Sequence, residues 1–262
     1  MRARPEHLVA ALALAAALPA HAGQGCRDEP LSVDEVRRSM ALAQRTYAAL
    51  DASGAAVAIV ARAGQDLSRY GLDYSHMGIV VRDHPAGRWT VVHELNTCGT
   101  ADSDLYTDGV GDFFLTDLYR YRAQVVIPGP DVQSRVAALL AGRTARRLHE
   151  PHYNMLSYVY STRYQNSNQW VLETLAAASA PPGAVETRTE AQSWLRSQGY
   201  RVPTVQIPAV VRLGARMFRA NVAFDDHPFD RRMAGQIDTV STEAVVDFVR
   251  GPDGRARVLV VE

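Results

Sequence analysis

His76 is the residue whose sequence context best suits acid–base chemistry. It opens the apolar run 76–81, which contains β-branched residues and is typical of a strand buried on one or both faces. A side chain at the end of such a strand can face a cleft, and a neutral imidazole near pH 7 can act as a general base. A lone histidine in this position is more often a core residue satisfied by one hydrogen bond, so the catalytic interpretation depends on its neighbours.

Ser167 is a nucleophile-type residue at the beginning of a predicted helix. The stretch 164–176 has a helical periodicity that places Ser167, Val171 and Leu175 on one stripe, with Ser167 at the N-terminal end. The dipole and the free N–H groups of a helix N-terminus favour a developing anion. The run Asn-Ser-Asn is also an ordinary helix-capping sequence, so a purely structural role for Ser167 stays open.

A second predicted strand, residues 89–95, offers a residue that could orient the imidazole. Side chains alternate between the two faces of a strand, so His93 lies on one face and Glu94 on the other. The sequence does not say which face meets His76. His93 and Glu94 are therefore rival candidates for the third member of a nucleophile, base and orienter triad.

The chain that carries these candidates has the pattern of one mixed α+β domain. Ser32 and Glu35 form a capping box at the start of a helix that continues to about residue 50. Strand patterns follow over 55–63, 76–81 and 89–95, and the last two form a hairpin around 83–87. The remaining predictions are a polar loop over 96–111, extended or mixed segments over 113–121 and 123–127, helices over 131–141 and 189–198, and a C-terminal β-hairpin of 245–249 and 257–261 around the turn 251–254.

The N-terminal segment predicts export. Arg2 and Arg4 precede a segment rich in Ala, Leu and Val that ends in Ala20-His-Ala22, which is the pattern of a signal peptide cleaved after Ala22. We expect a periplasmic or secreted protein with a single domain over 23–262, made of a core at about 32–180 and a C-terminal extension at about 181–262. No other apolar run approaches the ~20 residues of a membrane span, so we do not expect the mature chain to be membrane-embedded.

The charge balance bears on the class of partner. Without residues 1–22 the chain keeps 26 basic and 27 acidic residues, a formal charge of −1 with neutral histidines. Binding to nucleic acid relies on an excess of positive charge, so the composition argues against a nucleic-acid partner.

The chain has two cysteines, Cys26 and Cys98. Two thiols in an oxidising compartment usually pair, so an exported protein is expected to join them as a disulfide. The alternative leaves Cys98 as a free nucleophile in a thiol enzyme.

Metal binding is not predicted. His149 and His152 have a spacing that zinc could use, but Pro151 breaks the helix that would align them. The acidic loop 102–106 has Tyr106 where an EF-hand would need a third oxygen ligand. We assign no metal and no cofactor.

Two motifs give the chain a resemblance to a known group of enzymes. An apolar strand, the run Tyr74-Ser-His-Met-Gly-Ile-Val-Val81, a second strand and a distant Asn166-x-x-x-Trp170-Val at a helix start together resemble circularly permuted NlpC-type papain-like hydrolases, over about residues 55–178. In those enzymes the histidine precedes the cysteine, which heads the helix. The resemblance implies a permuted papain-like fold, with a central antiparallel sheet and packed helices, and a cleft in which Tyr74, Asn166 and Trp170 contact substrate. Over 71–111 and 153–178 the chain is also similar to domain-of-unknown-function family 2145, uncharacterised exported bacterial proteins without a known activity.

Ser167 stands where the permuted hydrolases carry their cysteine. A serine hydroxyl is far less acidic than a thiol, so Ser167 would depend on His76 as its base. The leading hypothesis is an exported hydrolase-like protein that acts on, or merely binds, an amide or ester such as a cell-wall peptide. The alternatives are a catalytically inactive binding or envelope-interaction module on the same fold, and a thiol enzyme that uses Cys98.

Overall fold

The computed structural model describes residues 30–251 and 256–262. The predicted signal peptide and Cys26 lie outside the described residues. The helices are α1 (Val33–Ser53), the 3₁₀ turn η1 (Ser68–Tyr70), α2 (Val110–Phe114), α3 (Pro130–Ala141), α4 (Thr144–Arg147), α5 (Ser167–Ser179), α6 (Arg188–Ser197), α7 (Ala209–Phe218), α8 (Phe229–Met233) and α9 (Thr242–Arg250). The strands are β1 (Val57–Ala63), β2 (His76–His84), β3 (Gly87–Asn96), β4 (Ser103–Gly109), β5 (Arg120–Ile127), β6 (Thr204–Gln206), β7 (Gln236–Asp238) and β8 (Arg257–Val261).

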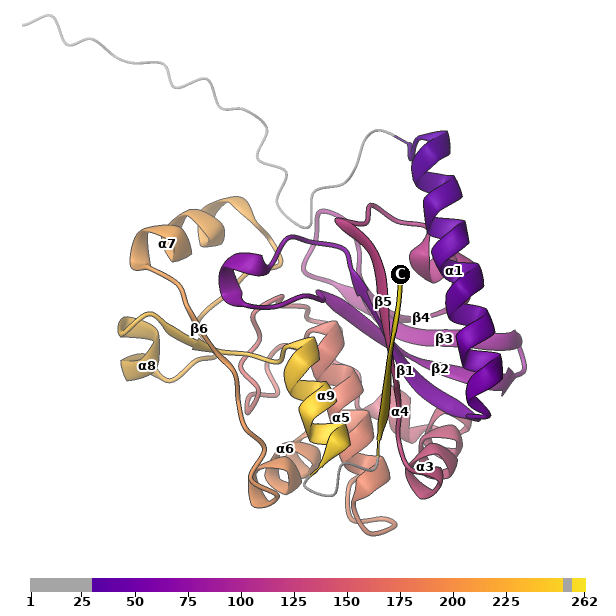
Figure 1. Cartoon of the computed structure of the whole chain (residues 1–262). Coiled ribbons are helices and arrows are strands. Elements are labelled where there is room, and N and C mark those ends of the chain that lie inside the picture. Colours follow the sequence, from indigo (N-terminus) through magenta and orange to yellow (C-terminus); the bar gives the residue numbers. More distant parts are fainter. Residues whose placement is uncertain (1–29, 252–255) are drawn as a thin grey trace, which may run out of the picture.

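An antiparallel sheet lies at the centre of the fold (Figure 1). Within the described chain it contains six strands in the order β4-β3-β2-β1-β5-β8. The predicted hairpin of β2 and β3 is present, and β1 lies between β2 and β5. Strands β6 and β7 pair with each other outside this sheet. The mixed α+β class with a central antiparallel sheet is therefore confirmed.

Helices cover both faces of the sheet. Helices α1 and α2 pack on one face, over a cluster that includes Trp89, Val91 and Phe113. Helices α3 and α5 pack on the other face, and α5 is buried along almost its whole length. In Figure 1 the indigo α1 and the salmon α5 lie on opposite sides of the strands. Helix α5 contacts β2 and β3 within this packing.

Alternation along β3 separates the two rival orienters. Val91 belongs to the cluster under α1 and α2, and Val92 belongs to the cluster under α5. Because neighbouring side chains of a strand point to opposite faces, His93 faces α1 and α2, and Glu94 faces α5. Both side chains are completely buried.

The capping signals in the sequence mark helix starts correctly. Ser32 and Glu35 form the capping box of α1, and Asn166 caps α5 by accepting a hydrogen bond from the Gln169 N–H. The C-terminal β-hairpin is wrong in its first half, because residues 242–250 form α9. Ser241 caps that helix, and its side chains Val245 and Val246 are buried. The cap and this packing outweigh the strand preference of the valines.

The polar loop predicted over 96–111 contains strand β4. It pairs along β3 from Thr90↔Gly109 to Asn96↔Ser103 at the edge of the sheet. An edge strand with one solvated face does not need apolar residues in alternation, so its acidic sequence gives little strand signal. This strand is the element of the site that the sequence analysis did not anticipate.

Gly78 of β2 lets the neighbouring strand approach closely. A Cβ at this position would lie 2.6 Å from Val91 Cγ1 and 2.9 Å from His93 Cβ. Any other side chain would therefore push β3, and His93 with it, away from β2.

We predict that Gly78→Ala lowers the free energy of unfolding by about 1–3 kcal/mol, because the added methyl overpacks the sheet. Urea denaturation of both proteins measures the difference. Gly214→Ala in α7 is the matched control, since a Cβ there has nothing within 4 Å. That control should be neutral or stabilising by up to ~1 kcal/mol. Equal, small effects at both glycines would contradict the close approach.

Candidate active site

A continuous chain of hydrogen bonds runs from the start of α5 to β4, and we call it the relay. His76 Nδ1 lies 2.9 Å from Ser167 Oγ, and His76 Nε2 lies 2.9 Å from His93 Nδ1. At the far end, His93 Nε2 lies 2.9 Å from Asp108 Oδ2. Three adjacent strands thus supply the two imidazoles and the carboxylate, and the helix supplies the hydroxyl.

The Asp108 carboxylate fixes where every hydrogen of the relay sits. Its hydrogen bond with His93 lowers the pKa of Asp108, so the group is ionised at neutral pH and can only accept. His93 must then donate from Nε2 and accept at Nδ1. His76 must donate from Nε2, which leaves its Nδ1 free to accept the Ser167 hydroxyl proton. The carboxylate on β4 therefore selects the His76 tautomer that a general base requires.

The surroundings keep both imidazoles neutral. Burial is the largest cause that lowers the pKa of His76 well below its usual value, and the charge of Arg62 adds to it. Burial also lowers the pKa of His93, against the opposing effect of Asp108. The Phe113 ring covers both, with its centroid 5.7 Å from His76 and 5.3 Å from His93. When both rings are neutral, each imidazole donates one hydrogen bond toward Asp108 and accepts one from the side of Ser167.

The Ser167 side chain does not cap α5. The cap of the helix is the Asn166 side chain, whose Oδ1 accepts the Gln169 N–H at 2.9 Å. Ser167 is 4% exposed, and it lies close enough to the Tyr153 hydroxyl to lower the pKa of that phenol, against the larger opposing effect of burial. Burial raises the pKa of Tyr153, so this phenol keeps its proton. The Ser167 hydroxyl therefore lies beside both a neutral base, His76, and the neutral phenol of Tyr153.

A small pocket of about 60 Å³ gives access to this hydroxyl. Its lining includes Ser167, His76, Tyr153, Arg62 and Glu94. Burial lowers the pKa of Arg62 to about 10, which leaves it a cation at neutral pH. The pocket thus combines a nucleophile-type oxygen, a neutral base and a nearby positive charge.

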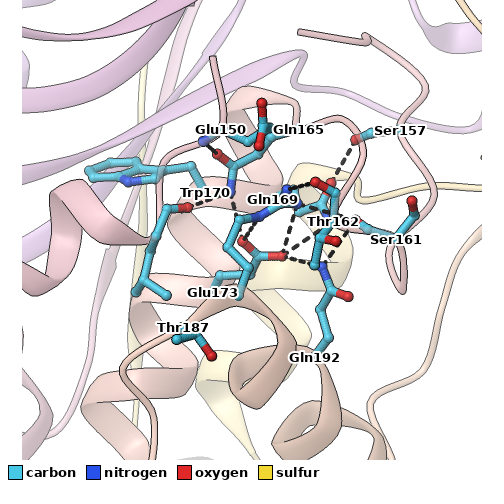
Figure 2. Close-up of polar contacts among 12 residues, drawn as sticks. Glu150, Ser157, Ser161, Thr162, Gln165, Gln169, Trp170, Glu173, Thr187 and Gln192 are labelled. Carbon is cyan, nitrogen blue, oxygen red and sulfur yellow. Dashed lines mark hydrogen bonds and ion pairs between the residues drawn. The ribbon is translucent and has the colours of Figure 1, made fainter. Parts of the chain in front are cut away.

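A buried polar cluster ties the segment that carries Tyr153 to α5. Glu173 lies at its centre and accepts hydrogen bonds from Gln165 at 2.7 Å and from Gln192 at 2.8 Å (Figure 2). Arg188 forms a buried ion pair with Glu173 at 2.8 Å and also donates to the Thr162 carbonyl. A charge buried without its partner is costly, so this cluster fixes the segment before α5 in one arrangement.

The structure brings together only some of the predicted site residues. His76, His93 and Ser167 are in contact through the relay. Glu94 lies on the other face of β3, where its Oε1 accepts a hydrogen bond from Ser103 Oγ at 3.0 Å. It does not contact His76 through any hydrogen bond among the described residues, so of the two rivals it is His93 that is bonded to the base.

The three residues expected to bind substrate have other surroundings. Trp170 is fully buried and donates its indole N–H to the Ala145 carbonyl at 3.0 Å, away from the pocket. Asn166 is committed to capping α5 and to a hydrogen bond with Thr239 Oγ1 at 3.2 Å. Tyr74 lines a second pocket beside the first. Cys98 is disulfide-bonded; the predicted pairing with Cys26 involves a residue outside the described part of the chain.

Asp108, Tyr153 and Arg62 are site residues that the sequence analysis missed. Asp108 lies in the segment 96–111 that the sequence predicts as a loop, where no alternation of side chains between two faces is expected. Arg62 is the lone charge of an apolar strand pattern, which is a usable signal. Tyr153 lies outside any regular helix or strand, and nothing in its local sequence distinguishes it.

In residues 30–251 and 256–262 there is no group of three or more His, Cys, Asp or Glu arranged to hold a metal ion. No helix within the same described segments is both long and apolar enough to cross a membrane.

Glu94 lowers the stability of the protein as the pH rises toward 8. Burial raises the pKa of Glu94 from 4.5 to about 8, and the Ser103 hydrogen bond only partly opposes this. Between these values the unfolded chain ionises Glu94 and the folded chain does not. Its contribution to stability is complete below pH 4.5 and is lost as pH rises toward 8.

We therefore predict that Glu94→Gln gains stability relative to the wild type as pH rises from 5 to 8, by at most about 1.4 kcal/mol per pH unit. Urea melts of both proteins at several pH values measure this. Glu186→Gln, at a side chain that is 55% exposed, is the matched control for the loss of one carboxyl group. A pH-independent difference for Glu94→Gln would show that its carboxyl ionises normally in the folded protein.

The comparison with known proteins gives a family and no activity. A family model described as "Uncharacterized protein conserved in bacteria (DUF2145)" matches residues 49–249, which include every residue of the relay. No curated protein and no solved structure matches the chain. The match covers most of the sequence, and the chain therefore belongs to DUF2145, a family of uncharacterised proteins conserved in bacteria.

Proposed function

We propose that this protein is an exported acyl hydrolase that cleaves an amide or ester through Ser167. The relay is the observation that carries the proposal. Its first bond places Ser167 Oγ 2.9 Å from His76 Nδ1, within the reach that proton transfer needs. Its other bonds orient the imidazole from behind, as the third member of a catalytic triad does.

The residues have distinct roles in the proposed reaction. Ser167 Oγ attacks the carbonyl carbon while its proton passes to His76 Nδ1. The imidazolium then gives this proton to the leaving amine or alcohol as the bond from the carbonyl carbon breaks. A water molecule attacks the resulting acyl-Ser167, again with His76 as base, and releases the acid and the free serine.

Neighbouring side chains act on the charges that develop on His76 and on the substrate during the proposed reaction. The positive charge that develops on His76 is opposed by Arg62, while Asp108 favours positive charge on the adjoining His93. The negative charge that develops on the substrate oxygen lies at the N-terminus of α5, near the Tyr153 hydroxyl and the Arg62 guanidinium. We assign Tyr153 as the side-chain donor to this oxygen, because it is a neutral phenol that lines the same pocket as Ser167.

The order of elements supports a permuted papain-like scaffold for this chemistry. The base comes from the start of β2, its orienting residue from β3, and the nucleophile follows later in the chain at the start of a buried helix. This is the order expected for permuted NlpC-type enzymes, with serine in place of cysteine. A cell-wall peptide is an amide of the kind that such a site would cleave. The expected export of the chain would give access to it.

We predict that Ser167→Cys reacts with iodoacetamide at pH 7 at least roughly tenfold faster than a free model thiol, because a thiol at a helix N-terminus beside an imidazole has a lowered pKa. Adding His76→Ala should remove the acceleration. Cys98 does not compete while its disulfide is intact. Mass spectrometry of the labelled protein over time gives the rates.

Ser241→Cys controls for the helix N-terminus alone, because Ser241 caps α9 and is 6% exposed. Labelling of Ser167→Cys no faster than this control, or unchanged by His76→Ala, would contradict the catalytic assignment. Accelerated labelling of Ser167→Cys with no reaction of wild-type Ser167 toward a fluorophosphonate would favour the alternative, an inactive binding module that keeps its base.

A further inference from the structure

Helix α7 presents its apolar side chains to solvent. Val210, Leu213 and Met217 are 78%, 63% and 65% exposed, and their spacing places them on one stripe of the helix, which we call the α7 face. Ala215 packs against the small core cluster around Ile237. Because an α-helix turns by about 100° per residue, Ala215 lies on the side opposite the α7 face. The stripe that a surface helix usually buries therefore points away from the protein.

Helix α8 adds two large apolar side chains close to α7. Phe229 and Met233 are 69% and 62% exposed, one helical turn apart. The end of α8 adjoins the start of α7, because the Ile207 N–H donates to the Gly235 carbonyl at 2.9 Å. Six of the thirteen exposed large apolar side chains in the described chain lie within 210–233. Figure 1 shows both helices apart from the strands of the central sheet.

The segment that contains α7 carries only positive charge. Residues 191–224 include five arginines and no Asp or Glu, although the whole chain has 28 basic and 28 acidic residues. Arg212 and Arg216 lie within α7, and Arg219 follows it. Arg216 is three residues after Leu213, so it flanks the α7 face, and Arg212 lies one turn earlier on the same flank. An outward apolar stripe is thus bordered by cations.

The charges of α8 do not cancel those of α7. Arg231 of α8 forms an ion pair with Asp238. The other two charged residues of α8, Asp230 and Arg232, have opposite signs. The net positive charge of this surface therefore belongs to α7, where the exposed apolar side chains also gather.

This combination of charge and exposed apolar surface selects an occupant. A second copy of the chain, docked through a two-fold axis on the α7 face, would bring Arg212 and Arg216 toward the same residues of its partner, and like charges repel. A bilayer with anionic headgroups meets both properties. The apolar stripe of an interfacial helix enters the boundary between headgroups and acyl chains, and arginines beside it bind lipid phosphates.

We propose that α7 anchors the protein to the surface of an anionic lipid bilayer, with the α7 face in the headgroup boundary and Arg212 and Arg216 on lipid phosphates. Phe229 and Met233 of α8 enter the same boundary. The helix lies in the plane of the membrane and does not span it. The proposal is independent of the reaction assigned to Ser167 and concerns the place where the protein works.

Cosedimentation with lipid vesicles tests the proposal, using the chain without the expected signal peptide, residues 1–22. We expect at least roughly tenfold tighter binding to vesicles of equal parts phosphatidylglycerol and phosphatidylcholine than to pure phosphatidylcholine. Raising NaCl to about 0.5 M should remove most of this preference, because salt screens exposed charges.

Two variants separate the apolar and the electrostatic contributions. Leu213→Ser combined with Met217→Ser should weaken binding to the phosphatidylglycerol vesicles at least about tenfold, because the stripe no longer enters the boundary. Arg216→Glu should remove the preference for phosphatidylglycerol. The matched controls on α1 are Met40→Ser, at a side chain 46% exposed, and Arg45→Glu, at an exposed residue, and both should bind as the wild type does. Thermal unfolding checks that each variant is folded.

Leu213→Trp reports where the α7 face lies. Its emission, after subtraction of the wild-type spectrum, should shift to the blue when phosphatidylglycerol vesicles are added, because the indole leaves water. Met40→Trp on α1 should show no such shift. An unshifted Leu213→Trp spectrum on vesicle-bound protein would contradict insertion of α7.

Absence of binding, equal binding to both vesicle types, or equal losses from the α1 variants would overturn the proposal. So would a dimer, detected by light scattering, that Leu213→Ser with Met217→Ser dissociates, because a second copy would then cover the α7 face. The iodoacetamide experiment on Ser167→Cys has no bearing on these outcomes.

Discussion

The ionised carboxylate of Asp108 is the constraint on which the rest of the site depends. A carboxylate can only accept, so it determines the tautomer of His93, and His93 in turn determines the tautomer of His76. Without that charge, the two imidazoles could reverse their hydrogen bonds and present an N–H to Ser167. The charge of Asp108, which is separated from Ser167 by two imidazole rings, thus decides whether the serine hydroxyl has a base.

The fold is arranged to hold this order of hydrogen bonds. Gly78 allows β2 and β3 to approach at the level of His93, and the Phe113 ring packs against both imidazoles. Burial lowers the pKa of both histidines, so both stay neutral at the pH where Asp108 is ionised. On the other face, the cluster around Glu173 holds α5, and therefore Ser167, at the end of the sheet. Local packing and electrostatics support the same single arrangement.

Sequence reasoning located the parts of the site that have a local signal. His76 begins an apolar strand and Asn166 caps a helix whose apolar residues recur at helical spacing, so both element boundaries are visible in the sequence. The choice between His93 and Glu94 needs the pairing of strands, which is not a local property. Asp108 could not be predicted for the same reason. The sequence of an acidic edge strand resembles that of a loop, and only its pairing with β3 identifies it as a strand. The valines of α9 led to the prediction of a strand, because the sequence pattern does not show that the Ser241 cap and contact with the core stabilise a helix there.

The ring nitrogens of the two histidines provide the most direct test of the relay. Two-dimensional ¹⁵N–¹H NMR of ¹⁵N-histidine protein at pH 7, assigned with His76→Gln and His93→Gln, distinguishes protonated from bare nitrogens in each ring. The account predicts that both rings are neutral and protonated at Nε2, and that Asp108→Asn disturbs the tautomer of His76 as well as that of His93. A His76 ring that is charged, or protonated at Nδ1, in the wild type would contradict it, because Ser167 would then have no base.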